Sequence, residues 1–436
     1  MRWLVGAIFV LLIALALGFG LLAYAMYALL GVMLLSRWLA NSWTKDLLAT
    51  RETNRDRVEI GDTVAVVIQL ENKGWLPIPW LLLEDLLPRK AMIFNPPNLQ
   101  PIGRRLQLFS FRGQGRKTIL YQLQCNRRGY YQIGPLIAET GDLFGLYRRY
   151  RILSEPSYLI AYPKLIPLEG FDVASRRPIG EVRMSHRLYE DPTRMAGVRA
   201  YQAGDSLNRI HWGATASTGT LHSKVYEAST IAGATLLLDF HAESFDPKNE
   251  PVRSELAVTA AASIANAICE MGQQVGLVTN ARDAAERIKK TGWQCDELPN
   301  RKLARETAAM LDESDRLRPQ IVPTARGGLQ LRQILEMLAR AEKTDGLNFS
   351  QLVRETTSRL PVSATVIAFL TEVTPQTAIA LGNLRRRGYA VTAILNTYEP
   401  YRFAEMSGEL IAQRVQTRQL VDEASIPYIC SNCVLR

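Results

Sequence analysis

The residue types that could carry out chemistry are concentrated in one stretch of the chain, residues 197–227. Asp205, His211 and Ser217 lie within it and could supply the acid, base and nucleophile of a hydrolytic triad. A serine nucleophile of the α/β-hydrolase kind sits in a strained Gly-x-Ser-x-Gly turn, however, and no serine of this stretch has that sequence around it. We therefore expect a structural or interaction role, not an enzyme, and keep a hydrolase built on Asp205 and His211 as an alternative.

The same stretch is predicted to fold as a turn, a short helix and a strand. Asp205 follows a glycine in a turn signal, and its carboxylate could cap the short helix that comes after it. Residues 221–226 alternate in the pattern of a strand with one face against a core. The charges around Trp212 predict a network in which Asp205, Arg209 and Lys224 lock together the domains on either side. The motif residues that we single out are Tyr201, Gly204, Asp205, Arg209, His211, Trp212, Lys224 and Glu227.

The overall charge narrows the class of partner. The chain has 436 residues, enough for two or three domains that each bury a core. Its net charge of +10 would attract anionic lipid or nucleic acid. The basic residues are spread along the chain in pairs such as Arg127–Arg128, without the aromatic interleaving that favours a nucleic-acid groove. We expect no nucleic-acid partner and keep a nucleic-acid-binding membrane protein as an alternative.

One apolar run, residues 3–35, predicts a membrane segment. A single helix of this length would be about 50 Å long, more than a hydrocarbon core of about 30 Å requires. A break at Gly18-Phe19-Gly20 therefore favours a transmembrane hairpin over residues 1–36, with one tilted helix as the alternative. Residues 37–57 form a basic linker, which predicts that both ends of the hairpin and the soluble domains lie in the cytoplasm, at the cell membrane.

The remainder of the chain predicts two domains of different class. Residues 58–167 contain short alternating strands divided by proline and glycine, the pattern of an immunoglobulin-like β-sandwich. Residues 168–231 form a linker that carries the motif described above. Residues 232–436 alternate between strands and helices, which predicts a parallel sheet covered on both faces, with residues 427–430 as a short last strand.

Cysteine usage fits a reducing compartment. The five cysteines are too few for a disulfide framework in a chain of this length. Cys430 and Cys433 have the spacing of half a zinc or redox site, but no second pair accompanies them. We therefore interpret them as a chance pair of thiols and expect no cofactor there.

Two groups of residues carry a resemblance to a known family. The first is residues 127–135, Arg-Arg-Gly-Tyr-Tyr-Gln-Ile-Gly-Pro, followed by residues 141–146 and 161–163. The second runs from Tyr201 to Trp212, with Lys224 and Glu227 after it. Together they resemble the bacterial "domain of unknown function" family number fifty-eight. The resemblance implies a membrane-anchored chain with a von Willebrand factor A-like α/β domain, no assigned enzymatic activity, and a MoxR-type AAA+ ATPase as protein partner.

The resemblance also implies where a metal ion could bind. Von Willebrand factor A domains often hold a divalent cation through an Asp-x-Ser-x-Ser loop after the first strand, aided by a later threonine and aspartate. In this chain the loop reads Asp239-Phe240-His241-Ala242-Glu243, so histidine and glutamate replace the two serines. Magnesium prefers small, hard oxygen ligands. Asp239, Glu243 and Thr371 are therefore only candidate ligands, and we expect the crevice beside them to contact protein with little dependence on magnesium.

These observations leave three classes of function. The first is a membrane-anchored protein-interaction or assembly factor that contacts the lipid bilayer and a protein partner. The second is the hydrolase, and the third is the basic nucleic-acid binder. We prefer the first class, because the membrane segment, the sandwich and the altered metal loop are all consistent with it.

Overall fold

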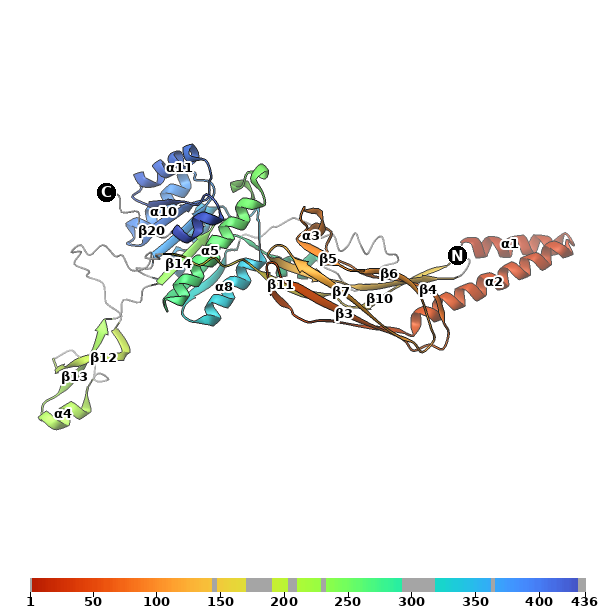
Figure 1. Cartoon of the computed structure of the whole chain (residues 1–436), viewed down its shortest axis with the longest axis horizontal. Coiled ribbons are helices and arrows are strands. Elements are labelled where there is room, and N and C mark those ends of the chain that lie inside the picture. Colours follow the sequence, from red (N-terminus) through yellow and green to blue (C-terminus); the bar gives the residue numbers. More distant parts are fainter. Residues whose placement is uncertain are drawn as a thin grey trace.

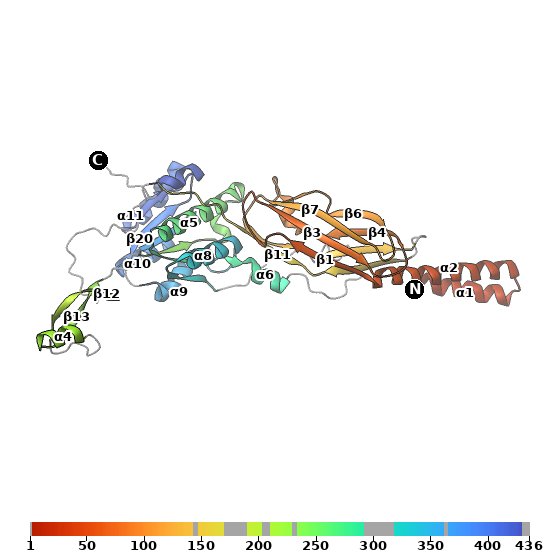
Figure 2. The same ribbon diagram turned by 60° about the horizontal axis from the view of Figure 1, so that its bottom comes forward.

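The molecule is elongated, with helices at one end, a β-sandwich in the middle and an α/β domain beyond it (Figure 1). The computed structural model describes residues 2–142, 147–169, 190–202, 210–228, 233–291, 318–361 and 365–429. A second view shows the same order of parts along the long axis (Figure 2). The N-terminal helices and the described motif residues therefore lie at opposite ends of the molecule.

Two N-terminal helices pack against each other. They are α1 (Arg2–Ala16) and α2 (Gly20–Lys45), and Gly18, with a φ of +74°, turns the chain between them. Leu11, Ala14 and Ala23 form their shared contact. In the described part of the chain, only α2 is long and apolar enough to cross a membrane; α1 contributes a shorter apolar segment. The expectation of two membrane passes within residues 1–36 is therefore corrected to one candidate span.

The predicted basic linker over residues 37–57 is replaced by regular structure. Helix α2 continues to Lys45, and the side chain of Trp43 is buried in the core of the sandwich. Strand β1 (Leu47–Thr53) begins two residues later and alternates between buried and exposed side chains. The Arg151 guanidinium donates hydrogen bonds to the carbonyls of Thr44 and Lys45, at the end of α2. Arg37, Lys45, Arg55 and Arg57 are exposed, which is typical of a basic linker, whereas the Arg51 side chain of β1 is buried.

The sandwich consists of three short sheets around one core. Their strand orders are β1-β3-β7-β5, β10-β9-β4-β6 and β2-β11-β8. Valines, leucines and isoleucines on alternate positions of β3 and β7 provide much of the core, as the period-two pattern predicts. The elements after β1 are β2 (Arg57–Glu59), β3 (Thr63–Asn72), β4 (Ile78–Asp85), α3 (Arg89–Ile93), β5 (Leu99–Ile102), β6 (Leu106–Phe111), β7 (Arg116–Cys125), β8 (Gly129–Ile133), β9 (Leu136–Gly141), β10 (Arg148–Ser154) and β11 (Ser157–Tyr162).

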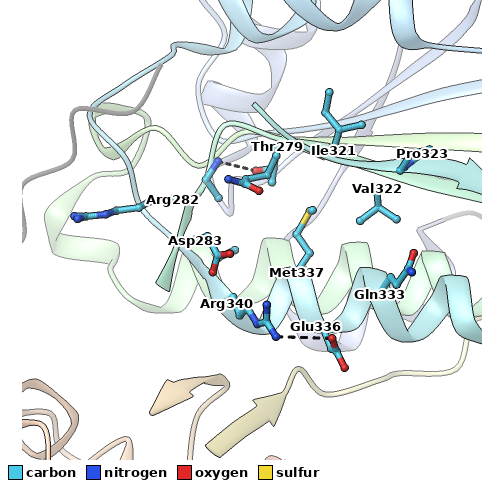
Figure 3. Close-up of a pocket in the computed structure, with 13 residues that line it drawn as sticks. Thr279, Arg282, Asp283, Ile321, Val322, Pro323, Gln333, Glu336, Met337 and Arg340 are labelled. Atoms are coloured by element: carbon cyan, nitrogen blue, oxygen red, sulfur yellow. Dashed lines mark hydrogen bonds and ion pairs between the residues drawn. The ribbon is translucent and has the colours of Figure 1, made fainter. Parts of the chain in front are cut away.

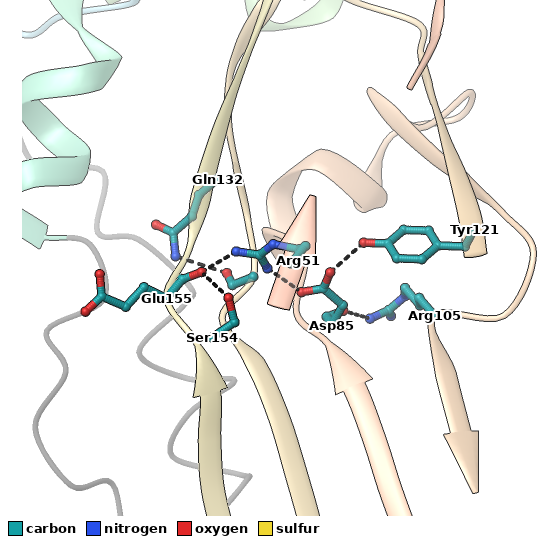
Figure 4. A network of polar contacts seen from close by, with 8 residues as sticks. Arg51, Asp85, Arg105, Tyr121, Gln132, Ser154 and Glu155 are labelled. Carbon is teal, nitrogen blue, oxygen red and sulfur yellow. Dashed lines mark hydrogen bonds and ion pairs between the residues drawn. The ribbon is translucent and has the colours of Figure 1, made fainter. Parts of the chain in front are cut away.

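A buried polar network joins strands of the sandwich where β4 ends, at Asp85 (Figure 4). The Arg51 guanidinium lies 2.8 Å from the Asp85 carboxylate, and the Tyr121 hydroxyl donates to the same carboxylate at 2.7 Å. Arg105 donates to the backbone carbonyl of Asp85 at 3.1 Å. Gly134 has a φ of +92°, and a Cβ there would collide with the Arg51 guanidinium. The network joins strands from different sheets and depends on a glycine beside the arginine.

The motif residues form a separate hairpin. Strand β12 (Glu190–Ala200) pairs antiparallel with β13 (His222–Ala228), and the short helix α4 (Trp212–Thr218) lies between them in sequence. We call these three elements the arm. In both views the α/β domain lies between the arm and the sandwich (Figures 1 and 2).

The α/β domain is built on a six-stranded sheet of order β17-β15-β14-β19-β20-β21. Only β17 runs antiparallel to its neighbour. The elements are β14 (Gly233–Leu238), η2 (Ala242–Ser244), η3 (Pro247–Asn249), α5 (Val252–Glu270), β15 (Gln274–Thr279), β16 (Arg282–Asp283), α6 (Ala284–Thr291), β17 (Gln320–Ala325), α8 (Gly328–Arg340), β18 (Ala341–Glu342), α9 (Phe349–Thr356), η4 (Thr357–Arg359), β19 (Thr365–Leu370), α10 (Pro375–Arg386), β20 (Ala390–Leu395), α11 (Pro400–Ala412), β21 (Gln416–Gln419) and η5 (Glu423–Tyr428).

Helices cover both faces of this sheet, as expected. One core contains apolar residues of α5 and α8, and the other contains apolar residues of α9, α10 and α11. The predicted last strand at residues 427–430 is wrong for its described part. Those residues belong to η5 and the turn after it, where the Asp422 carboxylate caps the helix by accepting from the Ser425 N–H. The last strand of the sheet is β21 instead.

Candidate functional site at the junction of the sandwich and the α/β domain

Asp239, the first candidate metal ligand, is a buried hydrogen-bond acceptor at the carboxyl end of β14. Its oxygens accept from the backbone N–H of His241 at 3.1 Å, the Ser244 hydroxyl at 2.7 Å and the Asn280 amide at 2.8 Å. Burial raises the pKa of the Asp239 carboxyl, while the bonds from Asn280 and Ser244 lower it. The carboxylate therefore orders its own loop.

The crevice predicted beside Asp239 is covered by the chain itself. Residues 344–347 cross the strand end: the Ala242 N–H donates to the Thr344 carbonyl at 2.7 Å, and the Thr344 N–H donates to the Phe240 carbonyl at 3.1 Å. The Asn280 amide also donates to the Leu347 carbonyl at 2.8 Å. A contact face for a partner is therefore not open at Asp239 itself.

The three candidate ligands do not make a magnesium site. Glu243 is exposed on the single turn η2, and Thr371 is half-buried after β19. Within the residues that the structure describes, no three His, Cys, Asp or Glu side chains are grouped so as to hold a metal ion. Magnesium needs near-octahedral oxygen coordination and retains several waters. Three donors already bond to the Asp239 carboxylate, and an ion would have to displace some of them, so these residues fit magnesium poorly.

The two described members of the proposed triad, His211 and Ser217, each form a hydrogen bond with the backbone of α4. His211 is the N-cap of α4, and its Nδ1 accepts from the Ala214 N–H at 3.0 Å. The Ser217 hydroxyl donates to the Ala214 carbonyl at 2.9 Å. Asp205 lies outside the described residues. Among the described contacts, His211 and Ser217 thus bond separately to backbone groups of α4 and not to each other.

The other motif residues are distributed over the arm. Trp212, the first residue of α4, is 69% exposed. Tyr201 and Lys224 are half-buried, and the Tyr201 N–H donates to the Leu221 carbonyl at 2.9 Å. Gly204, Arg209, the Glu227 side chain and the Cys430–Cys433 pair lie outside what the structure describes.

Other residues join the sandwich to the α/β domain, and Arg128 is central among them. Its guanidinium donates to the carbonyls of Leu338 and Ala341 at 2.6 and 3.0 Å, at the C-terminal end of α8. It also lies 3.1 Å from the Glu255 carboxylate and over the ring of Phe240. A cation at this helix end satisfies unpaired carbonyls and complements the helix dipole. Arg128 therefore joins the two domains, while Asp205 and Arg209 of the expected lock with Lys224 lie outside the described residues, so that lock stays a prediction.

A second contact lies beside it, around Glu336 of α8. The Glu336 carboxylate is 3.1 Å from the Arg57 guanidinium and accepts from the Tyr162 hydroxyl at 3.4 Å. Arg340 reaches the same carboxylate at 3.9 Å and lies over the ring of Tyr130. Figure 3 shows the Glu336–Arg340 pair at the edge of a pocket of about 270 Å³ between α8 and strand β17.

The connection after β11 adds a third contact. The Ile166 N–H donates to the Ser263 hydroxyl of α5 at 2.9 Å, and the side chain of Ile166 packs against the core of the α/β domain. Lys164 pairs with Glu423 at 2.7 Å, and the Glu169 N–H donates to the Pro427 carbonyl. The two domains are therefore docked along α5 and α8.

A cleft of about 780 Å³ opens beside this junction, between α3 and the loops after β14. Phe94, Tyr130 and Phe245 contribute apolar surface to it. Two of its cations are paired with acids: Arg287 forms two bonds to Glu342, at 2.6 and 2.7 Å, and Lys343 lies 2.8 Å from Glu250. These pairs neutralise much of the charge in the cleft, which suits a domain junction.

The sequence alone assigns no role to the pair Arg127–Arg128. The pair was interpreted as part of a dispersed basic pattern, although one member is almost completely buried. The sequence signal beside the pair is the glycine that follows it, Gly129. In the structure a Cβ at Gly129 would lie 2.7 Å from Cζ of the Tyr131 ring, so the chain is tightly packed just after Arg128.

The chain is similar to one curated protein and to several solved structures. Over 262 residues it is 25% identical to the uncharacterized protein YeaD of Bacillus subtilis, and the alignment covers 60% of this chain and 62% of that protein. A crystal structure of the CARDB domain of the PF1109 protein from Pyrococcus furiosus aligns at 12% identity over 27% of this chain and 92% of that one, with a TM-score of 0.19. A PapD-like domain of human CEP192 aligns at 15% identity over 26% and 82%, with a TM-score of 0.17.

A family match covers most of the arm and about the first two thirds of the α/β domain. Its matched region begins at Gly197, in β12, and ends at Thr371, just after β19. It therefore includes the Asp239 loop, Arg282 and helix α8, but neither the sandwich nor the N-terminal helices. The family that matches these residues, 197–371, is described as "Protein of unknown function DUF58".

Proposed function

We propose that this chain is a membrane-anchored protein-interaction or assembly factor whose arm contacts a protein partner. The arm carries the proposal, because it extends away from both domains and has a large exposed aromatic residue (Figure 1). By family resemblance, the partner is a MoxR-type AAA+ ATPase. The proposal assigns the chain no enzymatic activity.

The exposed apolar residues of the arm support a contact role. Trp212 begins α4, a helix in which no residue is buried, and Val198 and Leu221 are exposed on the adjoining segments. Tryptophan is among the residues that most often dominate binding energy at protein interfaces. The His211 cap and the β12–β13 pairing hold the tryptophan on a structured element, which lowers the entropy cost of binding.

The α/β domain supports the likeness to a von Willebrand factor A domain. Its first strand, β14, lies at the centre of the sheet, with β15 on one side and β19 on the other. The Asp239 loop follows that first strand, the place where such domains hold an ion. Because Asp239 bonds to its own loop, the proposed partner contact does not require magnesium.

The membrane arrangement is part of the proposal. Helix α2 supplies the span, and Arg37 and Lys45 follow its apolar part. By the positive-inside rule, these residues favour the cytoplasmic side for the sandwich and everything after it. No nucleic-acid partner is included. The buried arginines Arg51, Arg128 and Arg287 form ion pairs with acidic side chains and are not available to bind phosphate.

Capture from native membranes tests the partner contact. The full chain carrying an affinity tag is solubilised in mild detergent without nucleotide, and co-purifying proteins are quantified for wild type, Trp212→Ala and Trp75→Ala. Trp75 is a matched control, because it is 76% exposed but lies on the sandwich. We expect the AAA+ partner to be lost with Trp212→Ala and retained with Trp75→Ala.

The same capture is repeated in excess EDTA and in magnesium. Equal recovery in both conditions is the expected result. Loss of the partner in both tryptophan variants alike, or in neither, would refute the arm as its binding site. Recovery that requires magnesium and disappears with Asp239→Ala in a folded chain would show that an ion takes part.

A further inference from the structure

The end of the sandwich nearest α2 has an exposed tryptophan surrounded by basic residues. Two turns form this end, residues 73–76 between β3 and β4 and residues 112–115 between β6 and β7. We call these turns, with residues 45–46 at the end of α2, the rim. Trp75 is 76% exposed on it.

Hydrogen bonds make the rim one ordered unit. The buried Asn72 amide donates to the carbonyls of Leu76 and Arg112, both at 3.1 Å, which ties one turn to the other. The Gln114 N–H donates to the Gly74 carbonyl at 2.8 Å, and the Lys73 N–H donates to the Asp46 carbonyl at 2.9 Å. The position of Trp75 is therefore fixed relative to helix α2.

The rim is positively charged. Lys45, Lys73 and Arg112 are exposed cations and Asp46 is its acidic residue, so its formal charge is +2 (three cations minus one acid). No ion pair with an acidic side chain joins Lys73 or Arg112 in the described ranges. Arg149, exposed on β10, adds charge next to α2, because Arg151 of the same strand caps that helix.

The rim lies close to the headgroup layer if α2 spans the bilayer. The first charge after the apolar part of α2 is Arg37, and Leu39, only two residues on, already packs against the sandwich core. At 1.5 Å per residue, the sandwich therefore begins about 3 Å past Arg37 along the helix axis, and Lys45 is about 12 Å past it. The headgroup region is roughly 5–8 Å thick, and surface charge is felt over a Debye length of about 8 Å at physiological salt.

We propose that the rim is a docking surface for anionic lipid headgroups, with Trp75 placed at the membrane interface and Lys73 and Arg112 binding lipid phosphates. The proposal rests on the proposed membrane anchor. Tryptophan is enriched at membrane interfaces because its ring is apolar and its N–H is polar, and basic residues are attracted to the negative cytoplasmic leaflet. Together they would fix the sandwich upright against the bilayer.

The test uses the full chain reconstituted in liposomes that contain brominated phosphatidylcholine, with or without phosphatidylglycerol. The fluorescence of Trp75 is obtained by subtracting the signal of Trp75→Phe from that of the wild type. Trp212→Phe provides the matched subtraction for an exposed tryptophan on the arm. A third variant, Lys73→Glu with Arg112→Glu, reverses two exposed charges and leaves the backbone hydrogen bonds of the turns in place.

We expect the Trp75 signal to be quenched by bromine in liposomes with phosphatidylglycerol, and the Trp212 signal to be unquenched. Each basic residue near an anionic leaflet strengthens association about fivefold, so the double charge reversal should weaken the Trp75 contact by an order of magnitude or more. Equal quenching without phosphatidylglycerol would overturn the role of anionic lipid.

Flotation of the same samples separates the two proposals. If the chain floats with liposomes but Trp75 is unquenched, the docking surface is refuted and the anchor stands. If the chain does not float, both the membrane anchor and the docking surface are refuted.

Discussion

Replacing Arg128 by alanine should loosen the two domains from each other. The Arg128 side chain is 5% exposed, and its guanidinium donates to two carbonyls of the α8 terminus and forms an ion pair with Glu255 at 3.1 Å. Removing one member of a fully buried ion pair costs about 3–5 kcal/mol, because the other charge is left without a partner. Glu255 is 30% exposed and can regain water, so we take the lower end, about 3 kcal/mol.

The expected loss is large enough to measure by calorimetry. For domains of this size, 1 kcal/mol corresponds to about 2–4 °C, so Arg128→Ala should lower the melting temperature by roughly 6–12 °C. Hydrogen exchange should also become faster in β8 and at the end of α8, where the two domains meet. The control is Arg127→Ala. Arg127 lies over the ring of Phe94 within the sandwich, a contact worth about 0.5–1 kcal/mol.

One result would refute this reasoning. If Arg128→Ala and Arg127→Ala have equal melting temperatures and equal exchange at the end of α8, then Arg128 does not hold the junction. The contacts of Glu336 and Ile166 would then be sufficient to hold the sandwich against the α/β domain.

Three further predictions concern the Asp239 loop, a buried thiol and the membrane segment. Because burial raises the folded-state pKa of Asp239, its contribution to stability is present at low pH and is lost as the pH rises through that folded value. Asp239→Asn should flatten this decline, and its free energy of unfolding should stay within about 1 kcal/mol of wild type. Asp239→Ala leaves three donors unpaired and should lower the free energy of unfolding by about 3 kcal/mol or more. Urea unfolding across pH 4–8 measures both, and an equal loss of stability in the two variants would contradict the role of Asp239 as an acceptor. Burial raises the pKa of the Cys125 thiol to about 12, so iodoacetamide at about pH 8 should label the half-exposed Cys269 in the folded chain and Cys125 only after unfolding, as read by peptide mass spectrometry. A cytoplasmic reporter fused after Arg57 should be active, and activity of only a periplasmic reporter there would reverse the orientation.

Much of the α/β fold could be predicted because its central strands are continuous apolar runs. Strands β14 and β19 are buried on both faces, so their sequences read as strands without any partner being known. Strand β21, with the sequence Gln-Thr-Arg-Gln, is polar and lies at the sheet edge, so no hydrophobic pattern marks it. The apolar residues 427–430 predict a strand for the opposite reason, although residues 427–429 belong to η5 and the turn after it.

The candidate site was less predictable because its contacts join distant parts of the chain. Arg128 bonds to carbonyls 210 and 213 residues away, and a single sequence contains no signal for that pairing. The Asp239 loop was located correctly from the strand before it. Its covering by residues 344–347 could not be foreseen, because it depends on where the chain returns after α8.

The continuity between α2 and the sandwich has a mechanical consequence. Trp43 is embedded in the sandwich core, Arg151 holds the last carbonyls of the helix, and β1 starts at Leu47, so no slack separates helix from domain. If α2 spans a bilayer, its tilt adjusts to the local thickness of the hydrocarbon. The α/β domain is docked on the sandwich through α5 and α8, so the helix and both domains would move together. A small change in the tilt of α2 would then become a larger sideways displacement at the α/β domain.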